Sequence, residues 1–157
     1  MSETLEKAFE IMKDRVGSQT SQSKWFEVNQ QMIDEFADVT MDHQWIHVDV
    51  ERANEGPFGA PIAHGHLTLS IMGHLPKESK EIQGPQIEGQ KLGINYGFDR
   101  VRFPSPVPSG ARIRTTNTLK RVEIKGGMIE TMTEVVVEIE GQDKPACVAE
   151  SLGRMAF

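Results

Sequence analysis

The apolar residues of this chain change their spacing after its midpoint, and that change limits the folds available to it. Around residues 65–75, apolar side chains recur at helical spacing over much of the circumference, namely Leu67, Leu69, Ile71, Met72 and Leu75. Such a helix has to be surrounded by other elements, because it keeps no broad polar face for solvent. The segments that follow read as strands. We therefore predict an α+β domain in which one antiparallel β-sheet wraps around a long central helix.

Four segments after residue 90 have the character of strands, and they cover residues 91–103, 111–124, 131–140 and 145–156. The third segment alternates less polar residues with more polar ones, which is typical of a strand with one buried face. The proline-rich stretch FPSPVPSG favours a loop between the first two segments. Gly126-Gly127 predicts a turn before the third.

The first half of the chain reads as helices and loops. Helical spacing is present at residues 4–14 and at residues 30–39, where Asn29 is a candidate N-cap. Residues 24–28 are a candidate for a short strand. Asp49 is a candidate N-cap for a short helix that ends at the Gly-Pro pair beyond it.

Composition excludes several classes of protein. A net charge of −6 argues against a general affinity for nucleic acid. No apolar run approaches the ~20 residues that cross a bilayer, and the N-terminus lacks the layout of a secretory signal. We therefore expect a cytoplasmic protein that makes no membrane contact. The length suits one domain over residues 1–157, with residues 1–23 as an N-terminal helical extension.

Charge is spread unevenly along the chain. Residues 1–60 hold five basic and twelve acidic side chains, a net charge of −7, whereas residues 91–125 hold eight basic and two acidic ones, a net charge of +6. We expect most of these basic residues on solvated strand faces. A few of them could instead meet a small anionic group such as a nucleotide phosphate.

Four of the five histidines lie within 24 residues, beside two aspartates, and they permit three interpretations. His43 and His47 are four residues apart and would share the face of a helix, where they could bind a metal, although the zinc-protease glutamate is missing between them. Asp42 and His47 could instead form an acid–base pair that holds one water. On a continuous helix these two would lie about 140° apart, so the pair requires the chain to turn back after Met41. The third interpretation is a structural role.

The segment Ile62-Ala63-His64-Gly65 leads directly into the apolar helix. The N–H groups of a first helical turn have no partner within the helix and carry the positive end of its dipole. Because Gly65 has no side chain, a carbonyl oxygen that gains negative charge could approach this backbone closely. The alternative is that Gly65 only permits tight packing. We interpret His66 and His74 as structural.

The stretch FADVTMDHQWIHVDVERANEGPFGAPIAHG, from Phe36 to Gly65, resembles the signature of the MaoC-like (R)-specific enoyl-CoA hydratases and 3-hydroxyacyl-thioester dehydratases. That signature has an aspartate, four intervening residues, a histidine and then an I-A-H-G segment. The later stretch INYGFDRVRFPSPVPSGARIR is similar to the nodulation-protein-N-like branch, and the resemblance covers roughly residues 24–157. Trp45 departs from the pattern, because many hydratases have proline there.

The resemblance implies a hotdog fold, a homodimer and the reversible hydration of 2-enoyl thioesters to (R)-3-hydroxyacyl thioesters. It implies no metal and no cofactor, since coenzyme A enters only as part of the substrate, and acyl carrier protein is the other thioester carrier of the family. Asp42 and His47 take the positions of the catalytic pair. Gly65 offers its N–H to the thioester carbonyl, and Ala63 and His64 belong to the substrate-binding turn before it.

In that setting, the basic region supplies three candidates for a phosphate contact, which are Arg100, Arg102 and Lys120. The chain has no G-x-G-x-x-G and no G-x-x-x-x-G-K-[ST] motif, which also argues against a redox cofactor. The single cysteine, Cys147, excludes an internal disulfide, and its apolar neighbours predict a buried packing role rather than a nucleophile.

Two other functions stay open. A hotdog acyl-CoA thioesterase would use a carboxylate to direct water at the carbonyl carbon. A non-catalytic acyl-thioester binding protein would hold the same ligand and leave it unchanged. Ser70 has no G-x-S-x-G elbow around it, which argues against a serine hydrolase.

Overall fold

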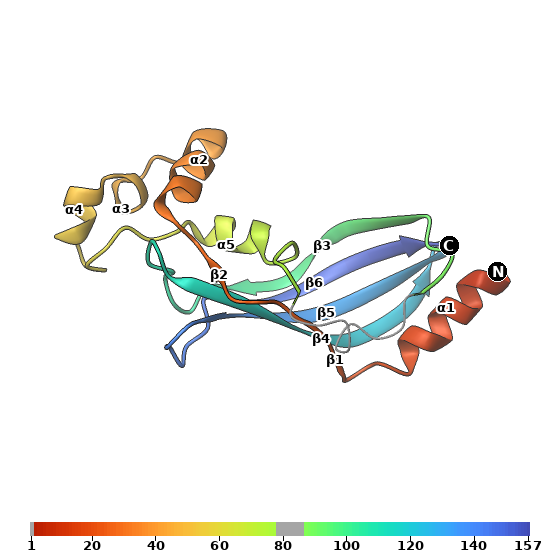
Figure 1. Cartoon of the computed structure of the whole chain (residues 1–157). Coiled ribbons are helices and arrows are strands. Elements are labelled where there is room, and N and C mark those ends of the chain that lie inside the picture. The colour runs from red at the N-terminus through yellow and green to blue at the C-terminus, as the bar shows by residue number, and fades with distance from the viewer. Residues whose placement is uncertain (1, 78–86) are drawn as a thin grey trace.

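A curved antiparallel sheet forms the body of the molecule, with helices at both of its ends (Figure 1). The computed structural model describes residues 2–77 and 87–157. The strands within this part are β1 (Gln19–Gln22), β2 (Phe26–Glu27), β3 (Leu92–Arg102), β4 (Arg112–Lys125), β5 (Met128–Ile139) and β6 (Cys147–Ala156). They pair antiparallel in the order β1-β4-β5-β6-β3, and β2 also pairs with β4. The strand predictions after residue 90 are confirmed to within a few residues.

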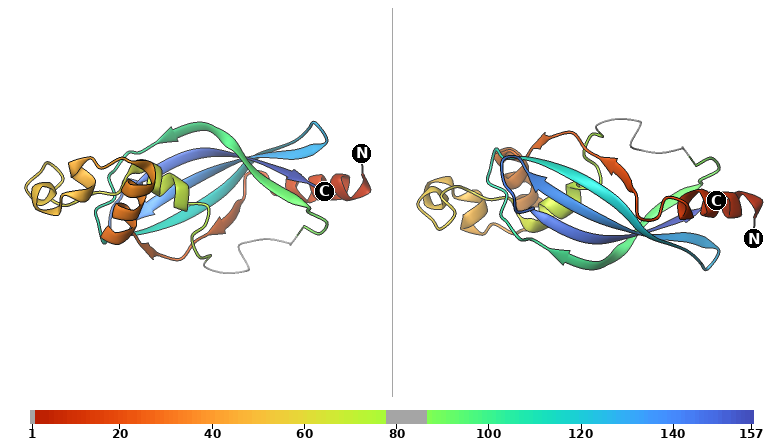
Figure 2. Two further views of the ribbon diagram at one scale, coloured as in Figure 1. Left: turned by 90° about the horizontal axis from the view of Figure 1, so that it is seen from above. Right: turned by 90° about the horizontal axis from the view of Figure 1, so that it is seen from below.

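The helices in the described residues are α1 (Glu3–Lys13), α2 (Gln30–Thr40), α3 (Trp45–Val48), α4 (Val50–Asn54) and α5 (Gly65–Ile71). Both predicted N-caps are confirmed. Asn29 accepts a hydrogen bond from the Met32 N–H at 3.0 Å, and Asp49 accepts one from the Arg52 N–H at 3.1 Å. α3 and α4 project beyond one end of the sheet and α2 lies at that end, whereas α5 lies over one face of the sheet (Figures 1 and 2).

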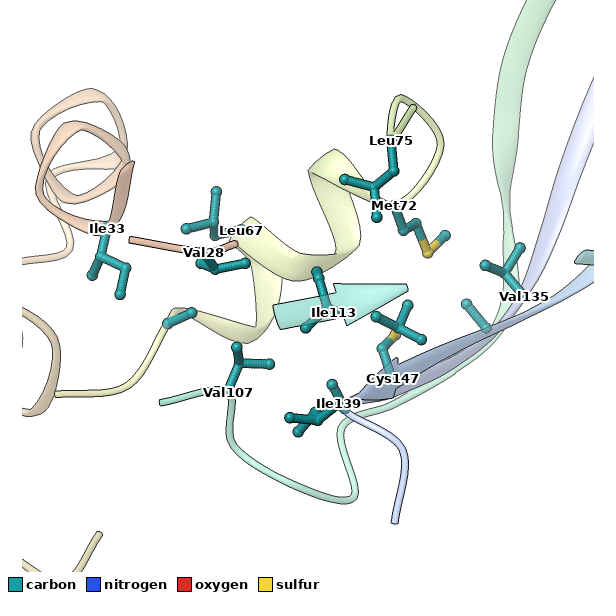
Figure 3. Close-up of a cluster of buried hydrophobic side chains, with 14 residues drawn as sticks. Val28, Ile33, Leu67, Met72, Leu75, Val107, Ile113, Val135, Ile139 and Cys147 are labelled. Atoms are coloured by element: carbon teal, nitrogen blue, oxygen red, sulfur yellow. The ribbon is translucent and has the colours of Figure 1, made fainter. Parts of the chain in front are cut away.

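The main core lies between α5 and the sheet. Leu67 of α5 and Met72 just after it are buried in one cluster with Ile113 of β4, Val135 of β5 and Cys147 of β6 (Figure 3). The predicted packing role of Cys147 is confirmed, and burial raises the pKa of its thiol to about 11. Burial of this apolar surface, at ~25 cal/mol per Å², stabilises the packing of α5 on the sheet.

The helix over the sheet is shorter than predicted. We expected it to run from Gly65 to Leu75, but α5 ends at Ile71. Beyond that point, the Pro76 carbonyl accepts a hydrogen bond from the Lys24 N–H at 2.7 Å, which draws the chain alongside the first strands. Gly73 and Pro76 also disfavour a further helical turn. Leu75 is nevertheless buried in the same core, so the apolar stripe was identified correctly although its helical extent was not.

The predicted helical extension over residues 1–23 is wrong for its last part. Residues 19–22 form β1, which pairs with β4 at the edge of the sheet. The sequence QTSQ has no apolar alternation, so nothing in it predicts a strand. Polar contacts across the pair take the place of buried ones, as in the hydrogen bond from the Asn117 amide to the Ser21 hydroxyl at 2.8 Å.

Most of the basic side chains of β4 pair with glutamates on β5 or just after it, as expected for solvated strand faces. The ion pairs include Arg112–Glu140 at 3.1 Å, Arg114–Glu138 at 2.8 Å and Lys120–Glu134 at 3.1 Å. At the other end of β5, the buried carboxylate of Glu130 accepts hydrogen bonds from Lys125 and Arg154, which lower the pKa of Glu130. Within the described residues, none of the helices has both the length and the apolar character needed to span a membrane.

Candidate active site

Asp42 lies in a turn that reverses the chain immediately after α2. Met41 ends that helix in the left-handed region, with φ at 62°, and it is the only described residue other than glycine with a positive φ. The Asp42 carboxylate accepts a hydrogen bond from the Gln44 N–H at 3.4 Å, which closes the turn locally. α3 then begins a new direction, so Asp42 and His47 do not share a continuous helix. The turn that the acid–base interpretation requires is present.

His47 is held from two sides by short hydrogen bonds. Its Nδ1 lies 2.6 Å from the Ile62 carbonyl oxygen, and the Gln30 amide donates to the His47 backbone carbonyl at 2.8 Å. Because a carbonyl oxygen only accepts, Nδ1 must carry the hydrogen. The lone pair of the neutral ring is therefore on Nε2, which is the arrangement needed in a general base.

Burial keeps the His47 ring neutral. The side chain is 6% exposed, and loss of solvation lowers the pKa of His47 below the ordinary value of 6.5. The hydrogen bond to Ile62 opposes this shift, the neighbouring His64 adds to it and the charge of Asp42 works against it. At neutral pH, His47 is thus an uncharged proton acceptor.

The side chains of Asp42, His47 and His64 come close together. One nitrogen each from His47 and His64 and one carboxylate oxygen from Asp42 lie within 4.8 Å of one another. The two histidines are buried, whereas the Asp42 side chain is 55% exposed and reaches in from the solvent side. Separations of this size leave room for a water molecule that touches both Asp42 and His47.

The same three residues are a poor metal site. The rings of His47 and His64 are stacked, with centroids 3.8 Å apart and planes at 25°. A zinc ion would have to lie ~2.0–2.1 Å from each nitrogen and in line with its lone pair, which two nearly parallel stacked rings do not offer. His43, the other candidate ligand, lies against Asp38 at 2.8 Å instead. The geometry does not support the metal interpretation.

A cavity of about 320 Å³ opens beside His47. Its walls are largely apolar and come from four parts of the chain, with Phe58, Ile62, Ala63, Gly65, Thr68, Phe103, Ser105, Pro106, Val107 and Ala146 as the other lining residues. His47 therefore presents a proton acceptor to a mostly apolar chamber, as in many small-molecule sites.

Gly65 serves a packing role that the sequence had left open. A Cβ on Gly65 would lie 3.0 Å from the ring carbons of Phe103, so any side chain would displace that ring from the cavity wall. The N–H of Gly65 belongs to the first turn of α5, where the helix supplies no acceptor. The close packing and an approach of a ligand to this N–H are compatible, because both are helped by the absence of a side chain.

The structure gathers some of the predicted site residues and separates others. Asp42, His47, Ala63 and Gly65 come together, with Ala63 and Gly65 in the cavity wall. His64 contacts Asp42 and His47 but is absent from the cavity lining, so the expectation that it contacts substrate is not supported.

The three basic candidates do not form one phosphate site. Arg100 and Arg102 lie on β3, whereas Lys120 lies on β4, with β5 and β6 between them. At ~4.8 Å between strands, the two groups are separated by ~14 Å across the sheet. Lys120 is also paired with Glu134, so its predicted phosphate role is not supported.

Sequence reasoning missed the residues that shape the cavity. Phe58 follows the Gly-Pro pair that ends a predicted short helix, and Phe103 lies where the predicted strand over residues 91–103 meets the proline-rich loop; neither is among the predicted site residues. A signal was available in the loop FPSPVPSG, where an aromatic residue beside prolines is a candidate for a rigid binding wall.

Comparison with known proteins shows the family of this chain. Residues 12–142 match the family described as the MaoC like domain. The chain is 47% identical over 152 residues to 3-hydroxyacyl-thioester dehydratase Z of Mycobacterium tuberculosis, with 94% of this chain and 97% of the relative covered. It is also 47% identical over 145 residues to Nodulation protein N of Rhizobium leguminosarum bv. viciae, with 91% and 88% covered.

A solved structure shares the fold. The X-ray structure of the monoamine oxidase regulatory protein from Archaeoglobus fulgius superposes with a TM-score of 0.75 and covers 94% of each chain. Its sequence identity is 22%, so this likeness concerns the fold alone.

The positive φ of Met41 predicts that glycine at this position would stabilise the folded protein. Met41 is 84% exposed, so its side chain contributes little packing, whereas its Cβ strains the positive φ. We expect Met41→Gly to raise the free energy of unfolding by about 1 kcal/mol, measured by urea denaturation. Met41→Ala keeps the Cβ and should give no such gain; equal stability of the two variants would contradict the strain argument.

Proposed function

This chain belongs to the MaoC-like dehydratase family, and on that premise we propose that Asp42 and His47 carry out its water chemistry. The protein is a hydratase–dehydratase that interconverts 2-enoyl and 3-hydroxyacyl thioesters, the reaction for which its Mycobacterium relative is named. Its sheet curved around α5 is the hotdog fold. The observation that supports the roles of Asp42 and His47 is their convergence beside a cavity that also includes Gly65.

His47 is assigned the proton transfers. Hydration forms an oxygen–carbon bond at Cβ and a carbon–hydrogen bond at Cα, and one water supplies both the hydroxyl and the proton. Nε2 of His47 accepts a proton as the water oxygen attacks Cβ, and the imidazolium then returns that proton to Cα. This assignment is supported by the position of His47 in the cavity wall and by the hydrogen bond that keeps its Nδ1 protonated. The product is expected to be the (R)-3-hydroxyacyl thioester.

Asp42 is assigned to hold the water and to stabilise the transient imidazolium. Its carboxylate approaches from the solvent side, where it can accept a hydrogen bond from the water O–H that does not react. A negative charge beside the imidazolium favours the protonated ring during the transfer. No further cofactor is needed for these steps.

Gly65 is assigned to the thioester carbonyl. As the water oxygen attacks Cβ and loses a proton to His47, negative charge moves to the carbonyl oxygen and an enolate forms. A backbone N–H from Gly65 would stabilise that charge, as donors in oxyanion holes do. A cavity of about 320 Å³ is near the lower limit for ligand pockets, so the four-carbon crotonyl group is a suitable probe.

Substitution of either acid–base residue tests this function. We expect Asp42→Asn and His47→Gln each to slow hydration of crotonyl-CoA ~10²–10⁴-fold, the usual contribution of acid–base groups. Loss of the enoyl-thioester absorbance measures the rate, and circular dichroism checks the fold. His74→Gln, on an exposed residue beyond α5, should keep the parent rate.

The same assay identifies other outcomes. Variants that hydrate at the parent rate would exclude the assigned pair. Free coenzyme A released from a saturated acyl-CoA would indicate a thioesterase, and binding of crotonyl-CoA without turnover would indicate a binding protein. Because burial lowers the pKa of His47, kcat/KM should stay constant at neutral pH and fall only as the pH drops through this lowered pKa and the base becomes protonated.

We propose Arg102 as a contact for the phosphates of coenzyme A. Within the described residues Arg102 makes no ion pair, and its guanidinium donates only to the Val101 carbonyl at 2.8 Å. It directly precedes Phe103 of the cavity wall. Arg100 is nearby on the same strand but already lies 4.0 Å from Glu150. Arg102 is therefore the better placed of the two cations.

A substrate without the nucleotide separates this contact from other effects. We expect Arg102→Ala to raise KM for crotonyl-CoA roughly 3–10-fold, as for loss of one exposed charge-assisted hydrogen bond. KM for crotonyl-pantetheine, which carries no phosphate, should not change. Lys91→Ala at the far end of β3 is the control. An equal effect of Arg102→Ala on both substrates would argue against a phosphate contact.

We propose that the protein pairs with a second copy of itself along β3. This strand is at the edge of the sheet and leaves its backbone open on one side. Its apolar side chains at alternate positions are exposed, namely Leu92, Ile94, Tyr96 and Phe98. A second β3 in antiparallel orientation would cover both the open hydrogen-bonding groups and these side chains.

A charge placed on this edge should prevent the pairing. We expect Ile94→Lys to sediment as a monomer under conditions where the parent is a dimer, because a buried lysine pair across the two copies would be costly. Val39→Lys places the same charge on an exposed position of α2 and should leave the dimer intact. A parent that sediments as a monomer would exclude the proposal.

A further inference from the structure

His64 is buried directly behind the proposed catalytic pair. Its side chain is 3% exposed. Its ring stacks on the ring of His47, and the ring of Phe36 from α2 packs against it with centroids 5.0 Å apart. These contacts define the position of His64 independently of any substrate.

The hydrogen bond that His64 makes reaches the main chain of Asp42. Nε2 of His64 lies 2.9 Å from the Asp42 carbonyl oxygen, and since that oxygen only accepts, Nε2 carries the hydrogen. The nearer carboxylate oxygen of Asp42 is 4.0 Å from the same nitrogen, which is too far for a hydrogen bond. The imidazole therefore holds the backbone of Asp42 and makes no hydrogen bond to its carboxylate.

Stability alone does not explain a histidine at this position. Nδ1 of His64 is buried and has no hydrogen-bond partner among the described residues. An unpaired buried acceptor destabilises the folded state, and an apolar side chain of the same length would avoid that cost. What an apolar side chain cannot supply is the N–H that Asp42 accepts.

We propose that His64 is a positioning residue that clamps the turn at Asp42 against the start of α5. In this way it sets the distance between the Asp42 carboxylate and Nε2 of His47. Gly65 follows His64 directly in the chain. The hydrogen bond from His64 to Asp42 therefore also fixes the position of Asp42 relative to the Gly65 N–H, which is assigned to the thioester carbonyl. The inference deepens the proposed function and depends on the roles given there to Asp42 and His47.

Two substitutions of equal length separate the hydrogen bond from the packing. The Nε2 atom of glutamine stands the same number of bonds from Cβ as Nε2 of histidine, so His64→Gln can still donate to Asp42. His64→Met fills similar space and has no donor. Displacement of a catalytic group by ~1 Å can lower a rate ~10²-fold. We expect kcat for crotonyl-CoA to fall by about that factor in His64→Met and by less than about 3-fold in His64→Gln, with KM nearly unchanged in both.

We expect His64→Met to lower activity without lowering stability. Because His64→Met removes an unpaired buried acceptor, its urea midpoint should equal or exceed that of the parent even though kcat falls. A merely structural histidine would give the opposite result, with lower stability in His64→Met and activity that recovers at low temperature.

A double variant tests whether His64 acts through Asp42. In an Asp42→Asn background the clamped carboxylate is already absent, so adding His64→Met should lower kcat less than about 3-fold further. A full additional loss would show that His64 acts by another route and would overturn the inference. Parent-like kcat in His64→Met, or equal losses in His64→Met and His64→Gln, would also overturn it.

The failure of this inference is distinguishable from failure of the proposed function. A parent protein that does not hydrate crotonyl-CoA would exclude both. A parent whose activity is lost in Asp42→Asn but kept in His64→Met would exclude only the positioning role.

Discussion

The hydrogen bond from the His47 imidazole to the Ile62 carbonyl connects the two segments that make the site. At 2.6 Å it joins α3 to the stretch that leads into α5, and the Ile62 N–H returns a bond to the Ile46 carbonyl at 3.0 Å. The same interaction sets the tautomer of His47, because Nδ1 must keep its hydrogen and Nε2 must remain an acceptor. Burial of the ring then keeps it neutral. The position and the tautomer of the proposed base thus follow from this contact, whereas its neutral charge follows from burial.

The cavity that His47 faces is formed by the elements packed around α5. The first turn of α5 stands beside the segment after β3, where Phe103 fills the space over Gly65. The cavity lies between that loop, α5 and the segment that carries His47. Its walls are apolar, which suits an acyl chain better than a charged ligand. The cationic groups of the sheet mostly pair with glutamates and so contribute to the fold rather than to the cavity.

Much of the fold could be predicted because its signals are local. Asn29 and Asp49 cap helices through contacts three residues away, and the strands after residue 90 carry their own alternation and turns. β1 could not be predicted, since its polar sequence becomes a strand only by pairing with β4. The end of α5 could not be predicted either, because the hydrogen bond from the distant Lys24 N–H to the Pro76 carbonyl holds the following chain beside the first strands.

For the site, the sequence by itself determined which residues are chemically able to act: an aspartate, a histidine five residues later and a glycine at the start of a helix. It also required a turn after residue 41 if the first two were to meet. Only the tertiary structure decided that they do meet, that His64 lies behind them rather than in the cavity, and that two strands separate the strand of Lys120 from that of Arg102. The reason is physical: chemical capacity belongs to the side chain, whereas distance, burial and protonation arise from contacts between segments far apart in the chain.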